Sequence, residues 1–230
     1  MKSTITALTA ASLKELDDIY GFFAYTNLSY KMFSDAVSSG FKTTAIITNR
    51  NLRVDQNDLK VKFDGFSKSY LGEVAFQLSV SAFEVWLFDL LRILLSDVHR
   101  LNKKRKIDVA DVIAAKSLGD LLTTIVDFEL NEIRYKKPAE WFEYLWSFVG
   151  VASPSAIDIA KLCEIKASRD ILAHNNGLAN STYISKSGAL ARVRDGDPID
   201  VSPAYWVNSW QHLREIVETV GSLVASRVPS

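Results

Sequence analysis

The longest apolar segment of the chain runs from residue 67 to residue 102 and contains no proline. Residues that favour helices occur throughout it, and we expect one long helix over Ser67–Asn102. Its central part, Val74–Leu95, is about as long as a membrane span. Charged residues inside this part, among them Glu84 and Asp89, would be costly in lipid. The segment therefore predicts a buried helix at the centre of a helical protein, without a membrane.

Several other segments carry signals for the start or the end of a helix. Ser12 and Glu15 form the pattern of a capping box, and Gly40 is suited to ending the helix that follows. Pro138 fits a first turn, because no N–H group is needed there. With the helical spacing of apolar residues, these signals predict helices over Ser12–Ser39, Asp108–Lys116, Leu118–Tyr135, Pro138–Val149, Ser155–His174 and Pro203–Arg227.

Two stretches, 41–66 and 178–202, lack a helical pattern. In the first, the β-branched run Thr43–Thr48 fits either a short strand or an extended connection. In the second, Thr182–Ile184 and Ala189–Val193 could pair as short strands around an Asp195-Gly196 turn. So little strand excludes an α/β sheet. We expect one all-α domain over residues 1–230: a helical bundle with irregular insertions, of which the second is a non-helical or hairpin excursion near the C-terminus.

The formal charge of the chain is balanced, with 27 Lys and Arg residues against 27 Asp and Glu residues. Proteins that bind nucleic acid without sequence preference are usually basic, so this balance argues against such a protein. Any contact with RNA must then be local or formed at an oligomer interface. Basic clusters at Arg100–Lys106 and Arg134–Lys137 are candidates for guiding RNA, and a solvated surface is the alternative.

The cysteine and histidine content argues against disulfides and metals. The single cysteine, Cys163, permits no disulfide within the chain, which favours a reducing compartment. The first residues lack the charged and apolar regions of a secretion signal, so we expect a cytoplasmic protein. His99 and His212 lack partners at metal-ligand spacing, and the chain has no glycine-rich phosphate loop. We therefore expect neither a metal nor a cofactor.

The helix predicted over Ser155–His174 ends in Arg169-Asp-Ile-Leu-Ala-His174, followed by Asn175-Asn176-Gly177. Asn and Gly tolerate the left-handed conformation that ends helices. An Arg side chain is a permanent cation whose fork of donors matches a phosphate, and a His side chain can give or take a proton near neutral pH. His174 could act as general base on a ribose 2′-OH while Arg169 stabilises the charge on the neighbouring phosphate.

The geometry of a helix limits how these two residues can meet. Five residues turn a helix through about 140°, so Arg169 and His174 do not share a face. Asp170 and His174 do, and the carboxylate could bond to the imidazole and fix its tautomer. A two-fold dimer with these helices facing would bring two Arg and two His into one cleft. The alternative is that His174 only interacts with the helix dipole and that Arg169 forms a surface ion pair.

An Arg-x4-His motif at the end of a late helix resembles the signature of HEPN domains, and the following Asn175, Asn176 and Tyr183 are similar to the RiboL-PSP or MAE-like branch of that family. The resemblance covers most of the chain loosely, and a few residues around the motif carry its specificity. It implies an all-α fold, a dimer, and a metal-independent ribonuclease site formed by the Arg and His of both subunits. It also implies a toxin or antiviral effector or, in inactive members, a binding or antitoxin-associated module.

Glu84 lies on the long central helix, on a polar stripe that also contains Glu73, Gln77 and Ser81. By the resemblance, an acidic residue on this helix faces the motif, where Glu84 could pair with Arg169 and orient it. The alternative is a stripe that faces solvent. The candidate catalytic residues are Arg169, His174, Asp170 and Glu84, and the candidate substrate-binding residues are Asn175, Asn176 and Tyr183.

We expect a metal-independent endoribonuclease that acts as a homodimer and leaves a 2′,3′-cyclic phosphate, because intramolecular attack by the 2′-OH needs no water. By the resemblance, its partners are RNA, a second copy of the chain, and an antitoxin or activating protein. The alternative is a HEPN-like dimer without activity that binds RNA, a nucleotide or a protein. Asp170 favours this alternative, because the family often has Asn or His at that position and a carboxylate repels phosphate.

Overall fold

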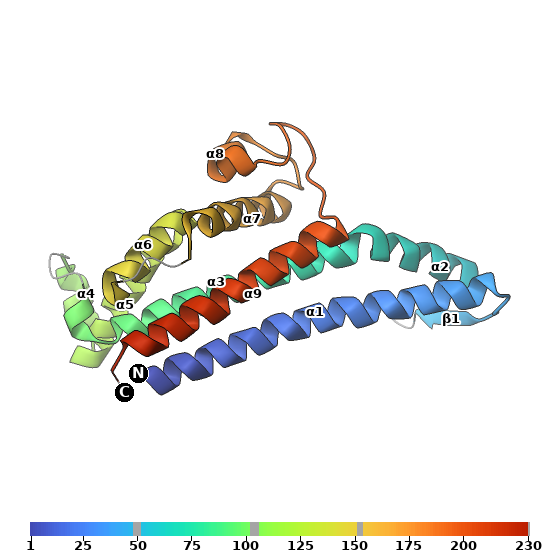
Figure 1. Ribbon diagram of the computed structural model, residues 1–230. Helices are drawn as coiled ribbons and strands as arrows, with labels where there is room; N and C mark the ends of the chain where they lie inside the picture. Colours follow the sequence, from blue (N-terminus) through green and yellow to red (C-terminus); the bar gives the residue numbers. More distant parts are fainter. Residues whose placement is uncertain (48–51, 102–105, 151–153, 230) are drawn as a thin grey trace.

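A computed structural model describes residues 1–47, 52–101, 106–150 and 154–229. Within these residues the protein is mainly α-helical, with one two-stranded sheet, so the predicted all-α class is confirmed. Figure 1 shows that the longest helices run side by side along the molecule: α1 (Lys2–Ser38), α3 (Leu71–Leu95) and α9 (Pro203–Arg227). They enclose most of the core.

Helix α3 is the centre of the core, as the long apolar segment predicted. It packs against α1, α9 and α7 (Ala156–His174), so it is buried on most of its circumference, and Trp86 has no exposed surface. The regular helix is shorter than residues 67–102, since it follows a π-helical turn at Phe66–Tyr70 and ends at Leu95. No helix in the described part of the chain has the length and apolarity needed to cross a membrane.

Helix α1 begins at Lys2 and not at Ser12, so the predicted capping box is wrong. Ser12 is buried in the middle of the helix, because packing against α3 and α9 extends α1 beyond the local signal. The contact with α9 is close at Gly221, where an added Cβ would come within 2.4 Å of Thr9 Oγ1. The predicted end is confirmed, since Gly40 follows the helix with a φ of +96°.

The first irregular stretch contains a β-hairpin. Strands β1 (Thr44–Ile47) and β2 (Leu52–Asp55) are antiparallel and pair over their whole length. The β-branched run Thr43–Thr48 therefore contains a strand, Thr44–Ile47, and is not merely an extended connection; Thr43 precedes the strand, and Thr48 lies outside the described residues.

Helix α2 (Gln56–Gly65) follows the hairpin directly, so the prediction of irregular structure over residues 56–66 is wrong. The helix buries none of its residues fully and so lacks the apolar stripe that marks a helix in a sequence. Its start is nevertheless encoded locally. The Asp55 carboxylate accepts hydrogen bonds from the N–H groups of Asn57 and Asp58, at 2.7 and 3.0 Å.

The helices between α3 and α7 lie close to their predicted positions: α4 (Val109–Ala114), α5 (Leu118–Arg134) and α6 (Pro138–Val149). Local signals start them, since the side chains of Asp108 and Ser117 cap the first turns of α4 and α5. Gly150, with a φ of +69°, ends α6. In Figure 1, α4 to α6 lie at one end of the molecule, and α7 continues from them along α3.

The second irregular stretch is partly helical. Thr182–Ile184, predicted as a strand, lies inside helix α8 (Ser181–Ser187), and Ala189–Val193 begins in a 3-10 turn. The predicted pair of strands is therefore wrong. The Asp195-Gly196 turn is confirmed, since Gly196 has a φ of +85°. Figure 1 shows α8 on the outer side of α7, and the excursion packs against α7 between Glu164 and Ile171.

Candidate functional site

The motif residues lie on the last turns of α7, and the chain reverses directly after them. The N–H groups of Asn175 and Gly177 both donate to the carbonyl oxygen of Ile171, at 2.9 and 3.0 Å. Asn176 and Gly177 have φ values of +51° and +74°, as the predicted stop requires. His174 is thereby placed in the final turn, where its side chain is exposed.

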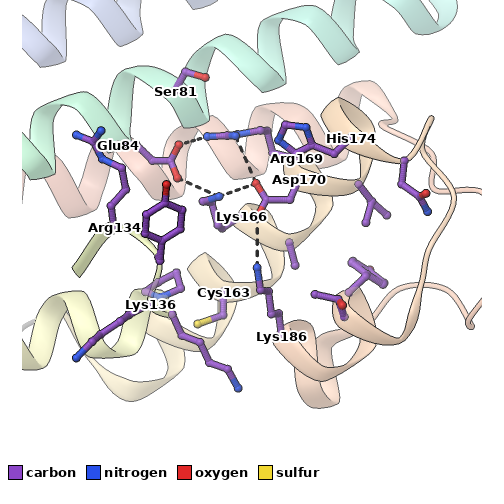
Figure 2. A pocket seen from close by; sticks show the side chains of 18 of the residues that line it. Ser81, Glu84, Arg134, Lys136, Cys163, Lys166, Arg169, Asp170, His174 and Lys186 are labelled. Atoms are coloured by element: carbon purple, nitrogen blue, oxygen red, sulfur yellow. Dashed lines mark hydrogen bonds and ion pairs between the residues drawn. The ribbon is translucent and has the colours of Figure 1, made fainter. Parts of the chain in front are cut away.

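A cavity of about 770 Å³ lies beside this end of α7. Residues of α3 form one wall, the turn between α5 and α6 forms a second, and α7 and α8 form the others (Figure 2). The cavity brings together most of the predicted site residues, namely Glu84, Arg169, Asp170, His174, Asn175 and Tyr183. Asn176 is exposed and does not belong to this lining.

An ion-pair network crosses the cavity (Figure 2). Arg169 bonds to the Glu84 carboxylate through Nη2, and its Nη1 lies 3.3 Å from the Asp170 carboxylate. Lys166 contacts the same two carboxylates, at 3.2 Å from Glu84 and 2.5 Å from Asp170. Lys186 of α8 lies 3.6 Å from Asp170. The polar stripe of α3 therefore faces α7 at Glu84, and Glu84 pairs with Arg169, which is one of the two alternatives that the sequence left open.

The lining of the cavity is basic, although the whole chain is neutral. The carboxylates of Glu84 and Asp170 are outnumbered by six cationic side chains: Arg134, Lys136, Lys137, Lys166, Arg169 and Lys186. The network pairs both carboxylates with cations of α7 and α8. The three cations of the α5–α6 turn form no ion pair with another described residue. A local positive excess of this kind attracts phosphate groups.

His174 stands apart from the ion-pair network. The expected bond from Asp170 to its imidazole is not formed, because that carboxylate is engaged by Lys166, Arg169 and Lys186. Within the residues that the structure describes, no hydrogen bond or ion pair holds the imidazole. Figure 2 shows His174 on the side of the network away from Arg134. The ring is thus exposed to a ligand or to a second chain.

Tyr183 forms part of the cavity wall, but it is only 1% exposed. Its hydroxyl donates to Glu164 at 3.4 Å and accepts the backbone N–H of Arg192 at 2.9 Å. The hydroxyl of Tyr205 also donates to Glu164, at 2.8 Å, and burial together with this carboxylate raises the pKa of Tyr205. Tyr183 therefore occupies a supporting position, and not the expected position of a residue that contacts substrate.

Asn175 and Cys163 also line the cavity. The amide nitrogen of Asn175 donates to the carbonyl of Leu178 at 2.6 Å, so this side chain holds the turn after α7 while its amide oxygen accepts no bond from another described residue. Cys163 is half-buried, and this burial raises the pKa of its thiol. The thiol therefore stays protonated near neutral pH.

Sequence analysis missed the lysines of the network. Lys166 precedes Asp170 by one helical turn, and this i,i+4 spacing was an available signal. Lys186 reaches the cavity from α8, a helix that was not predicted. Of the basic clusters, Arg134–Lys137 lies on the cavity, whereas residues 102–105 of the cluster Arg100–Lys106 lie outside the described residues.

The described residues contain no group of three or more His, Cys, Asp or Glu side chains that could hold a metal ion. The candidate site consists of the exposed imidazole of His174, a cluster of cations and two carboxylates. No family model matches the chain, and no match is found among curated proteins or among solved structures.

Proposed function

We propose that the protein is a metal-independent endoribonuclease of the HEPN type, which cuts RNA in the cavity beside His174. The observation that carries the proposal is the meeting of Arg169, His174 and Glu84 in one basic cavity. A residue that can take a proton and a cation that can hold a phosphate are the parts that such a reaction needs. The resemblance of the segment Arg169–His174 to the HEPN motif supports the same proposal.

In the proposed reaction, His174 removes the proton of a ribose 2′-OH, and the freed oxygen attacks the adjacent phosphorus. The bond from phosphorus to the 5′-oxygen then breaks, and the leaving oxygen takes a proton from an acid. Arg169 and Lys166 stabilise the negative charge that gathers on the phosphoryl oxygens. The products are one strand with a 2′,3′-cyclic phosphate and one with a 5′-OH. Because the attack is intramolecular, no activated water is required.

We further propose that the active form is a homodimer. His174 is exposed at the end of α7, so a second copy related by a two-fold axis can reach it there. The imidazole of the second copy would supply the acid that protonates the leaving oxygen. In this proposal the protein is a cytoplasmic toxin or antiphage effector, restrained by an antitoxin or switched on by an activating protein.

The test is cleavage of an end-labelled RNA of mixed sequence in EDTA. The wild type is compared with Arg169→Ala, His174→Ala and the control His99→Ala, whose imidazole is exposed outside the cavity. We expect the first two variants to lose about a hundredfold or more in rate and the control to match the wild type. The wild-type products should carry cyclic-phosphate ends. Cleavage that survives both cavity substitutions would rule out this site.

A second candidate function is binding without cleavage, to RNA, a nucleotide or a protein. One observation favours it: Arg169 is already bonded to two carboxylates, whose negative charge offsets the positive charge that must stabilise the phosphoryl oxygens during cleavage. In that case the wild type leaves the RNA intact but binds it, and Arg169→Ala weakens the binding. Expression in cells separates the two candidates as well, because an active nuclease slows growth and His174→Ala relieves that effect.

A further inference from the structure

The turn between α5 and α6 presents an aromatic side chain at the cavity. Tyr135 is 91% exposed, which is unusual for a large ring. Its neighbours Arg134, Lys136 and Lys137 are exposed too, and all four line the cavity that contains His174. A ring left in water among cations contributes little to packing. Its position is the one expected of a side chain that contacts a ligand with both a flat face and negative charge.

The backbone of this turn is fixed by hydrogen bonds. The indole N–H of Trp141 and the backbone N–H of Lys136 both donate to the carbonyl of Ile133, at 2.8 and 2.9 Å. The backbone N–H of Lys137 donates to the Glu140 carboxylate at 3.0 Å. The backbone that carries the ring and its flanking cations is therefore fixed before any ligand binds, which reduces the backbone entropy lost on binding.

The cationic side chains of the turn lie along one wall of the cavity. The Arg134 guanidinium lies 4.8 Å from the ring centre of Phe88 on α3, so it is held against the cavity wall. Figure 2 shows Arg134 and Lys136 on one side of the ion-pair network and His174 on the other. A strand with a regular series of phosphates could contact the turn first and then cross the network toward His174.

We propose that Tyr135 stacks on a base of single-stranded RNA while Lys136 and Lys137 bind the flanking phosphates, and that the strand continues across the cavity to His174. This inference rests on the proposed function and gives its substrate class, an unpaired strand. A base in a duplex is already stacked on both faces, whereas an unpaired base has a face free for the ring. An acidic peptide would satisfy the lysines but leave the ring without a partner.

The experiment measures the binding of a short, labelled RNA in EDTA by the full chain carrying His174→Ala, so that cleavage does not interfere. In this background Tyr135→Ala and Tyr135→Trp are compared with Tyr25→Ala, a control whose ring is 74% exposed on α1, outside the cavity. We expect Tyr135→Ala to raise the Kd for the single strand about tenfold. Tyr135→Trp should restore the affinity, and Tyr25→Ala should leave it unchanged.

Two further measurements define the substrate. Annealing the RNA to its complement should weaken binding and remove the effect of Tyr135→Ala, because the bases are then unavailable. Joint Lys136→Ala and Lys137→Ala substitutions should make the negative slope of log K against log salt shallower by about 1.4, as expected for the loss of two phosphate contacts on a single strand. An unchanged Kd in Tyr135→Ala would overturn the inference. The same Tyr135 dependence for duplex RNA or for polyglutamate would also overturn it.

Failure of the proposed reaction and failure of this inference are distinguishable. A wild type that cuts nothing, but whose binding to the single strand depends on Tyr135, would contradict only the reaction. An enzyme that cuts RNA at an unchanged rate and Kd after Tyr135→Ala would contradict only the stacking role.

Discussion

Arg169 and Glu84 are 85 positions apart in the chain, yet their side chains bond to each other inside the cavity. The pair joins α7 to α3, and both side chains are mostly buried, at 16% and 18% exposure. Asp170 and Lys166 complete the surroundings of this pair. The guanidinium is therefore held in one place, and under the proposed function its carboxylate partners would compete with the RNA phosphate.

Glu84→Gln tests this competition, since it keeps the shape of the side chain and removes its charge. Arg169 and Lys166 are then left with one carboxylate between them, so we expect the free energy of unfolding in urea to fall by about 1–3 kcal/mol. RNA affinity should rise, because a negative charge is lost beside the phosphate. Asp89→Asn, on an exposed position of the same helix, is the matched control and should change neither quantity. Weaker RNA binding in Glu84→Gln would contradict the competition.

Arg192→Met tests what holds the excursion over α7. The Arg192 guanidinium lies 3.0 Å from Glu164, whose side chain is only 7% exposed, and also donates to the Asp200 carbonyl at 2.7 Å. Its loss leaves a buried carboxylate without a cation, so we expect the free energy of unfolding to fall by about 2–3 kcal/mol. Limited proteolysis within residues 188–202 should accelerate. Arg194→Met, at an exposed position of the same segment, should leave both measurements unchanged.

Gly221→Ala tests the close contact between α1 and α9. The new methyl group would lie 2.4 Å from Oγ1 and 2.5 Å from Cγ2 of Thr9, so we expect a loss of about 1–3 kcal/mol in stability. Thr9→Ala in the same chain should recover part of that loss, which a double-mutant cycle measures. The control is Gly65→Ala, where the added atom meets nothing within 4 Å. This control should stabilise the protein by up to about 1 kcal/mol.

Cys163 offers a chemical probe of the cavity. Its pKa is raised by burial, and only the thiolate reacts with iodoacetamide. We therefore expect slower alkylation in the folded protein than in the urea-unfolded chain. In the folded protein, the rate of alkylation should rise with pH over a higher pH range than in the unfolded chain. Bound single-stranded RNA should slow the reaction further, because Cys163 lines the cavity. Equal rates in folded and unfolded protein would contradict the raised pKa.

The helix ends that could be predicted are those fixed by residues next to them in sequence. Pro138 starts α6, and the left-handed Asn176 and Gly177 end α7, each for a local chemical reason. The predicted start at Ser12 failed because tertiary packing continues α1 past it. Helix α8 was missed because it is short and buries few residues, although the Asn180 side chain caps it by accepting the N–H of Tyr183 at 2.9 Å.

The candidate site was predictable only where one helix or one polar stripe carried the signal. The polar stripe of α3 indicated Glu84 as a candidate, but the sequence left open whether the stripe faces the motif, as the resemblance implies, or solvent. The packing of α3 against α7 places Glu84 on Arg169. The bond from Asp170 to His174 did not form, because Lys166 on the preceding turn, together with Arg169 and Lys186, holds the carboxylate. The cations of the α5–α6 turn reach the cavity through tertiary packing, which no local pattern encodes.

The cavity is positively charged, although the net charge of the whole chain is zero. This combination affects both the association rate of an anionic ligand and the lifetime of its complex. At physiological ionic strength, the field of such a cluster is screened within about 8 Å, so RNA is not drawn in from a distance. The association rate should then vary little with salt, while the lifetime of the complex shortens as salt rises. Under the proposed function, the protein would release most RNA strands quickly and select among them by residence time.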